Sequence, residues 1–176
     1  MDEITNDVVA AVMGMSPTKE MYSLFHSRTI LHIKRTIRNL ARIGEAFGAS
    51  PNVIKERAEN HDKTKYQSAE MIPYVWLTWF HQQNKEGKDF KYPDGVEKQV
   101  EKATLHHIEH NRHHPEFHNQ PSNMTPLDIM EMVADWAAMS QELGTSLKGW
   151  VDDVAMEKWE FSKKQQKLIY QIVGLF

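Results

Sequence analysis

Residues 20–48, EMYSLFHSRTILHIKRTIRNLARIGEAFG, decide the fold class of this 176-residue chain. Apolar side chains recur in this stretch at the three- and four-residue steps that mark one face of an α-helix. They are Leu24, Ile30, Ile33, Ile37, Leu40 and Phe47. The spacing predicts one long helix with this face buried, and Gly48 is the residue expected to end it.

The same periodicity continues beyond this helix. Ser50-Pro51 places an N-cap before a proline at the first helical position, which predicts a short helix running toward His61. Another helix is expected to begin near Ser68, with Pro73 in or near its first turns. Residues 87–95, which contain two glycines and a proline, form the clearest loop.

The second half of the chain also has helical spacing. Val96, Val100 and Ala103 begin a helix that is expected to stop near Pro115. Thr125-Pro126 predicts the cap of the next helix. Ser162 and Gln165 fit a capping box for the last helix, which carries Leu168, Ile169, Ile172 and Val173.

No stretch alternates between apolar and polar residues as a half-buried strand does. The sequence therefore predicts an all-α fold, a single compact helical domain of about six or seven helices over residues 1–176. The motifs described below fall within about residues 20–140, and the C-terminal helices are expected over 149–175.

The composition excludes several classes of protein. Hydrophobic residues make up 40% and aromatic residues 10%, which indicates a globular chain. The net charge of −3 gives no broad basic face for duplex nucleic acid, and the absence of cysteine excludes disulfides and thiolate sites. Met1-Asp2-Glu3 does not begin a signal peptide, and no run approaches the ~18 apolar residues of a membrane span. We expect a soluble cytoplasmic protein.

Histidines and acids spread along the chain are candidate metal ligands. His32, the doublet His61-Asp62 and Asp135 offer the nitrogen and oxygen donors that first-row divalent metals prefer. Each has another interpretation when taken alone. His32 fits a core-edge residue, His61-Asp62 a helix-terminal pair, and Asp135 a partner for a nearby Arg or Lys.

A second group of histidines lies in HHIEHNRHH, residues 106–114. The stripe Val96, Val100, Ala103 continues with the same alternation to positions 107, 110 and 114, all of them histidine. Three stacked imidazoles on a buried face need a metal, a carboxylate or a phosphate as partner. His106 and His113 are expected at the flank of this face. The alternative is a solvated histidine-rich helix end.

The helix after Thr125 carries Asp135 on a largely apolar surface, with Glu131 and Asp128 one and two turns earlier on the same side. A buried Asp needs a cation or hydrogen-bond donors.

Together these elements resemble the HD-domain superfamily of metal-dependent phosphohydrolases. More narrowly, the chain is similar to small HD-like proteins of bacteria and phages. The elements that carry the resemblance are His61-Asp62-Lys63-Thr64-Lys65-Tyr66, Glu70 with Pro73-Tyr74, His106-His107 with Asn111 and His113-His114-Pro115-Glu116, and Glu131-Met132-Val133-Ala134-Asp135-Trp136.

The resemblance implies a ligand set. His32, His61, Asp62 and Asp135 would bind a first divalent ion (Mn, Fe, Co, Ni or Zn), with Asp62 as the bridging ligand if a second ion is present. His107, His110 and His114 lie in the interval where dinuclear branches of the superfamily add histidines. Their spacing departs from those branches, so a second metal, binding of substrate phosphate and acid–base chemistry remain alternatives.

The function implied is hydrolysis of a nucleotide or related small phosphate ester by a metal-activated water. Lys65, His110 and His114 are the expected catalytic residues, and the alternative for Lys65 is a solvated lysine at a helix start. Arg112 and Lys63 are weaker candidates for phosphate contacts. Two other functions remain open: an HD-type di-iron oxygenase, and a module that binds a metal or nucleotide without turnover.

Four aromatic side chains form a run, Tyr66, Tyr74, Trp76 and Trp79. The run fits a helix-core stripe better than a platform for a nucleobase. The surplus of Trp and Met on the helices leaves room for a homodimer.

Overall fold

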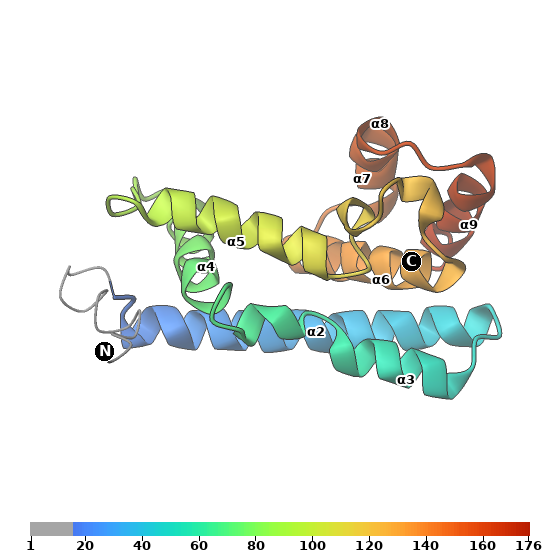
Figure 1. Cartoon of the computed structure of the whole chain (residues 1–176), viewed down its shortest axis with the longest axis horizontal. Coiled ribbons are helices and arrows are strands. Elements are labelled where there is room, and N and C mark those ends of the chain that lie inside the picture. The colour runs from blue at the N-terminus through green and yellow to red at the C-terminus, as the bar shows by residue number, and fades with distance from the viewer. Residues whose placement is uncertain (1–15) are drawn as a thin grey trace. The chain divides into compact units, whose positions relative to one another are not determined.

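The computed structural model describes residues 16–176, and these residues form helices joined by turns, with no strand (Figure 1). The all-α prediction is therefore confirmed for the part of the chain that is described. The expectation about a signal peptide falls on residues 1–15, outside the described residues. No described helix is both long and apolar enough to cross a membrane.

Six of the α-helices have ten residues or more: α2 (Lys19–Ala46), α3 (Pro51–Asn60), α4 (Met71–Lys85), α5 (Val96–His110), α6 (Pro126–Leu143) and α9 (Lys163–Val173). The shorter elements are η1 (Lys63–Tyr66), η2 (Pro115–Phe117), η3 (Pro121–Asn123), α7 (Leu147–Trp150), the π-helical η4 (Val151–Ala155) and α8 (Met156–Lys158).

Several helix ends lie where the sequence predicts them. Pro51 is the first residue of α3, and Pro73 lies in the first turn of α4. Capping boxes begin both α6, from Thr125, and α9, from Ser162. The end predicted near Pro115 is wrong, because α5 already ends at His110.

The chain divides into two compact units. Of the described residues, the first unit comprises 16–28 and 65–106, and the second comprises 29–64 and 107–176. Helices α2 and α5 contribute residues to both. The single domain expected from the sequence stays a prediction.

The core of the second unit is built around α6, which packs against α9 and α7. Ten of the residues of α6 are buried, so this helix is apolar on most of its surface. Beside it lies an aromatic group in which Trp136 contacts Trp150, Trp159 and Phe161.

The first unit has its own smaller core. Its buried apolar residues are Met21, Phe25, Val75, Trp76, Val96 and Val100. The aromatic rings of Phe80, Phe90 and Tyr92 contact one another next to this core. Trp76 is buried here, as the core interpretation of the aromatic run predicts.

The buried face of α2 differs from the predicted one. Ile30 and Ile37 are 46% and 38% exposed. Four buried positions near them are polar: Thr29, His32, Thr36 and Asn39. Leu40, on the predicted face, is fully buried as expected. The Asn39 Nδ2 donates to the backbone oxygen of Ala134, at 3.2 Å. Because tertiary contacts of this kind satisfy polar groups, hydrophobicity alone does not identify the buried face.

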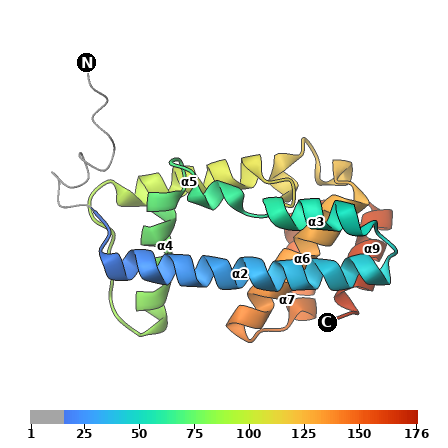
Figure 2. The same ribbon diagram turned by 90° about the horizontal axis from the view of Figure 1, so that it is seen from below.

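Helices α2 and α3 run side by side after the turn that joins them (Figures 1 and 2). A glycine in the interior of α2, Gly44, allows the close approach. A Cβ added at Gly44 would lie 2.7 Å from the Cγ1 of Ile54 on α3. Glycine costs about 1 kcal/mol relative to alanine in a helix interior, so the contact with α3 outweighs that cost here.

We expect Gly44→Ala to destabilise the protein by about 1–2 kcal/mol. Overpacking a core typically costs ~1–3 kcal/mol, whereas the gain in helix propensity is only ~1 kcal/mol. Urea denaturation measures the change. Gly149→Ala is the matched control, since a Cβ there meets Ser146 at an ordinary 3.5 Å, and its midpoint should stay or rise. An equal rise in the midpoint of urea denaturation for both variants would contradict the packing role of Gly44.

Candidate metal centre

Four of the predicted ligands lie together in the second unit. His32 comes from α2, His61 and Asp62 follow the last residue of α3, and Asp135 comes from α6. The His32 Nε2 lies 2.8 Å from Asp135 Oδ1 and 3.5 Å from Asp62 Oδ2. The His61 Nε2 lies 3.5 Å from Asp135 Oδ1 and 3.8 Å from Asp62 Oδ2. Ligands 103 positions apart along the chain thus converge because three helices carry them.

These distances fit a metal site. Ligand atoms about 2.0–2.2 Å from one ion are separated from each other by about 3–3.5 Å. His32, His61 and Asp62 form one group whose ligand atoms could hold an ion. The buried His61 Nε2 makes no hydrogen bond with the described residues. A buried polar atom without a partner is costly, and a metal would satisfy it.

The backbone at Asp62 has a positive φ of 58°. It is the one non-glycine residue with this conformation among residues 16–176. The left-handed region is disfavoured for residues with a Cβ, although Asp tolerates it better than most, and such positions concentrate at functional sites. This conformation follows the end of α3 and turns the Asp62 carboxylate into the buried group of histidines.

The two oxygens of Asp62 face different histidines. Oδ2 lies toward His32 and His61. Oδ1 lies 3.2 Å from the Nε2 of His107 and 3.6 Å from the Nε2 of His113. A carboxylate with one oxygen toward each of two imidazole groups has the arrangement of a bridging ligand.

The second imidazole group consists of His107, His113 and His114, which together could also hold an ion. His107 is 4% and His113 3% exposed, and the His114 ring packs against both. The buried His114 Nε2 makes no hydrogen bond with the described residues. The inward positions expected for His107 and His114 agree with the structure. The flanking position expected for His113 is wrong.

The inward position expected for His110 is also wrong, because this residue is exposed. Helix α5 ends at His110, and the chain then turns. Asn111 occupies the place one turn beyond His107, where its Nδ2 donates to the His107 backbone oxygen at 2.8 Å and to Thr64 Oγ1 at 2.8 Å. The turn after Asn111 brings His113 inward, so the position of His113 does not follow from the helical spacing of α5.

His106 belongs to the first unit. Its Nδ1 lies 2.7 Å from Oε1 of Glu70, a carboxylate that is fully buried. This pair accounts for the flanking position of His106.

Glu131 on α6 contacts one histidine of each imidazole group at its Nδ1 atom. Its Oε1 lies 3.0 Å from the Nδ1 of His61 and 3.5 Å from the Nδ1 of His113. A carboxylate at Nδ1 fixes the proton on that nitrogen and leaves Nε2 to act as the ligand atom. One oxygen thus orients a histidine of each group toward Asp62.

Arg57 on α3 holds this carboxylate in place. Its Nη1 donates to Glu131 Oε2 at 2.9 Å and its Nη2 to Asp128 Oδ1 at 2.6 Å. Asp128 also caps α6 through Thr125 and accepts hydrogen bonds from Nε and Nη2 of Arg112, both at 3.1 Å. The guanidinium of Arg112 is therefore engaged with Asp128.

The sequence grouped Asp128 and Glu131 with Asp135 but did not identify Arg57. Arg57 lies four residues before His61, so the two share a face of the same helical segment. The spacing of four residues between Arg57 and His61, together with the two acids Asp128 and Glu131 on another helix, could have indicated that Arg57 pairs with these acids.

The carboxylates of this centre are held ionised. Burial opposes a charge on Asp135, but the neighbouring imidazoles of His32 and His61 hold its pKa well below the usual range. Burial likewise opposes a charge on Glu131, but His113 and His61 lower its pKa to about 2. For His61, burial favours the neutral ring, yet Asp62, Asp135 and Glu131 raise its pKa to about 10. Without a metal, a proton on imidazole balances this negative charge.

His114 differs from His61. Burial and the neighbouring His113 lower the pKa of His114 to about 2, so its imidazole is neutral. A neutral imidazole with a buried Nε2 can bind a metal. It suits this role better than that of the catalytic acid that the sequence allowed for His114.

The lysines expected near substrate have other contacts. The Lys63 Nζ donates to Asn60 Oδ1 at 2.9 Å. Lys65 belongs to the first unit, where its Nζ lies 5.5 Å from the centre of the Tyr74 ring. Its catalytic role stays a prediction.

Comparison with known proteins places the chain in a family. A model described as "Family of unknown function (DUF5662)" matches residues 21–175, so the chain belongs to this family. The match includes every residue of the centre described above. No curated protein and no solved structure matches the chain.

We expect the metal-free protein to be most stable near pH 6.5. Below this pH the unfolded chain protonates His114, whose pKa is about 2 when folded and 6.5 ordinarily, so the stability falls. The Glu131 pKa is about 2 when folded and 4.5 ordinarily, so its contribution is complete above pH 4.5 and is lost as the pH falls toward 2. The His61 pKa is about 10 when folded and 6.5 ordinarily, so its contribution is complete below pH 6.5 and is lost as the pH rises through 10.

Urea denaturation in the presence of a chelator measures this profile. The Glu131→Gln variant should lose less stability than the wild type as the pH falls from 4.5 toward 2. A stability that rises steadily from about pH 6.5 to 9 would contradict the charge balance described here.

Proposed function

We propose that this member of the DUF5662 family is a metal-dependent phosphohydrolase that acts on a nucleotide or a related small phosphate ester. The arrangement of Asp62 is the observation that carries the proposal. Its two oxygens face two separate imidazole groups, and the first group also contains the Asp135 carboxylate. The order His32, His61-Asp62, Asp135 along the chain is the order of the HD superfamily that the sequence resembles.

Each ion would have its own set of side chains. The first set is His32, His61, Asp62 and Asp135, as expected from the sequence. The second set is Asp62 with His107, His113 and His114, in which His113 replaces the predicted His110. Imidazole and carboxylate ligands suit Mn, Fe, Co, Ni or Zn.

The side chains of the centre have distinct tasks. When bound, a divalent ion lowers the pKa of its water from ~15.7 toward ~7 and supplies hydroxide near neutral pH. Glu131 keeps the Nε2 atoms of His61 and His113 directed at the ligand positions. Arg57 neutralises Glu131 and Asp128, so these acids do not compete with the ligand carboxylates for a cation. Lys65 remains the proposed contact to the reacting phosphate.

A second candidate is a di-iron oxygenase on the same ligand set. The observation that favours it is the histidine-rich second group, His107, His113 and His114. Iron content and oxygen consumption distinguish it from a hydrolase. A module that binds a metal or nucleotide without turnover would show loss of thermal stability with a chelator and neither activity.

We expect two divalent ions per wild-type chain after loading, measured by mass spectrometry of the metal content. Asp62→Asn should lower the content sharply, because this side chain serves both sites, and asparagine also tolerates its left-handed backbone. Asp135→Asn should remove the first ion, and His113→Gln only the second.

His110→Gln is the matched control for the metal measurement, since His110 is an exposed histidine next to the centre. It should keep the wild-type content. Unchanged content in both Asp62→Asn and Asp135→Asn would refute the site.

We expect the metal-loaded protein to release phosphate from at least one member of a broad nucleotide panel. Asp62→Asn should lower kcat/KM by roughly 100- to 1,000-fold, the range typical for loss of a group that stabilises charge in the transition state. His110→Gln should retain near wild-type activity. If the loaded wild type binds both ions yet releases no phosphate while a control phosphatase does, the hydrolase proposal is wrong and the metal site stands.

A further inference from the structure

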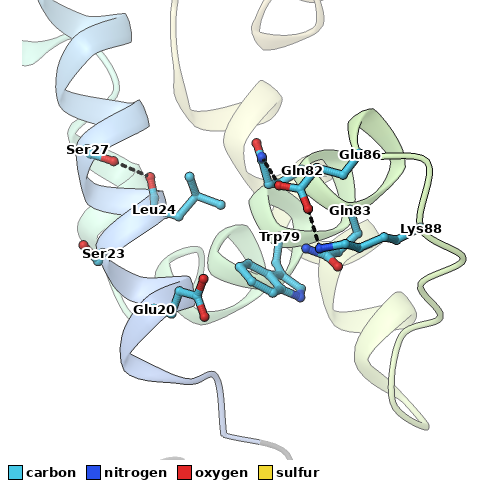
Figure 3. A pocket seen from close by; sticks show the side chains of 9 residues that line it. All are labelled: Glu20, Ser23, Leu24, Ser27, Trp79, Gln82, Gln83, Glu86 and Lys88. Atoms are coloured by element: carbon cyan, nitrogen blue, oxygen red, sulfur yellow. Dashed lines mark hydrogen bonds and ion pairs between the residues drawn. The ribbon is translucent and has the colours of Figure 1, made fainter.

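A pocket in the first unit lies apart in sequence from the metal ligands. It is formed by the first turns of α2 and the last turns of α4, together with the loop through Lys88, and its volume is about 500 Å³. Figure 3 shows Glu20 and Leu24 of α2 and Trp79 and Gln83 of α4 around the same space. Ligand pockets typically occupy about 300–1,000 Å³, so one small organic molecule fits.

The amide of Gln83 is the most informative group in this pocket. Gln83 is 8% exposed and lines the pocket, and neither atom of its amide is among the fully enclosed polar atoms that lack a partner in residues 16–176. The amide is therefore accessible from the pocket. The group offers one acceptor and two donors to whatever enters the pocket.

The walls near Gln83 are apolar. Trp79 lines the pocket from α4, and Leu24 lines it from α2. Trp79 also packs, partly buried, against the core of the unit in which Trp76 is buried. The indole and the leucine offer apolar surface to a flat ring.

The charges in the pocket disfavour an anion. Its one lysine, Lys88, is paired with Glu86, with the Nζ 2.6 Å from Oε2. Glu86 is further bonded by the amide of Gln82. Glu20 adds a carboxylate that has no ion pair among the described residues. With two acids and one paired base, the pocket would repel a phosphate group.

We propose that this pocket binds the base of a nucleoside, with the ring stacked on Trp79 and its edge hydrogen-bonded to the Gln83 amide. Nucleobases present neighbouring donors and acceptors that match an amide bidentately, and they stack well on aromatic side chains. The negative charge selects a nucleoside over a nucleotide. The site is independent of the proposed phosphohydrolase activity, because none of its residues belongs to the metal centre.

The test uses the full chain with adenosine and uridine as probes, by saturation-transfer NMR and isothermal calorimetry with a chelator present. We expect millimolar or tighter binding of at least one nucleoside, and weaker binding of its 5′-monophosphate. Glucose is the probe for a sugar site. Binding of glucose without either nucleoside, or of no probe at all, would overturn the proposal.

Two variants and a control assign the binding to the pocket. Trp79→Ala should weaken nucleoside binding at least about tenfold, in line with loss of one base–aromatic stack. Gln83→Leu should weaken it about tenfold, because leucine cannot form the hydrogen bonds of the amide.

Gln99→Leu makes the same chemical change at an exposed position of α5 and should leave binding unchanged. A Gln83→Leu variant that binds nucleoside as the wild type does would overturn the proposal. Loss of metal in Asp62→Asn should not affect this binding, so failure of one proposal is distinguishable from failure of the other.

Discussion

The contact between Arg57 and the two acids of α6, Asp128 and Glu131, supports the rest of the candidate metal centre. It links the last turns of α3 to the first turns of α6, so the segment that presents His61 and Asp62 is fixed relative to the helix that presents Asp135. Removing one member of a buried ionic network typically costs about 3–5 kcal/mol, because the remaining charge has no partner. The geometry of the centre therefore depends on residues that would not contact an ion.

The centre concentrates negative charge in a small volume. Asp62, Asp135 and Glu131 lie around the same imidazoles, and Glu131 is also paired with Arg57. Carboxylates buried together must be balanced by protons or cations. In the metal-free protein the balance comes from protonated histidine, which is consistent with the raised pKa of His61. A divalent ion would supply the same charge from the ligand side of the ring, while Glu131 remains at the other nitrogen.

Local periodicity and capping residues predicted the all-α fold and the helix caps. The set of four converging ligands was predicted from the resemblance to the HD superfamily. The sequence did not predict His113 or the exposure of His110, since both depend on where α5 ends and how Asn111 turns the chain. It also misassigned the buried face of α2, where Asn39 is buried and Ile37 exposed. The contacts of Arg57 were not predicted either. Its partners lie 71 and 74 positions away, and the one sequence signal was its spacing of four residues from His61.

The single oxygen of Glu131 that serves His61 and His113 has a consequence for how ions would enter. An ion on His61 would act on the same Glu131 oxygen that orients His113. Two sites that share one orienting group and one bridging carboxylate are thermodynamically coupled, and the coupling is reciprocal. An ion in one site would therefore change the affinity of the other site for its own ion.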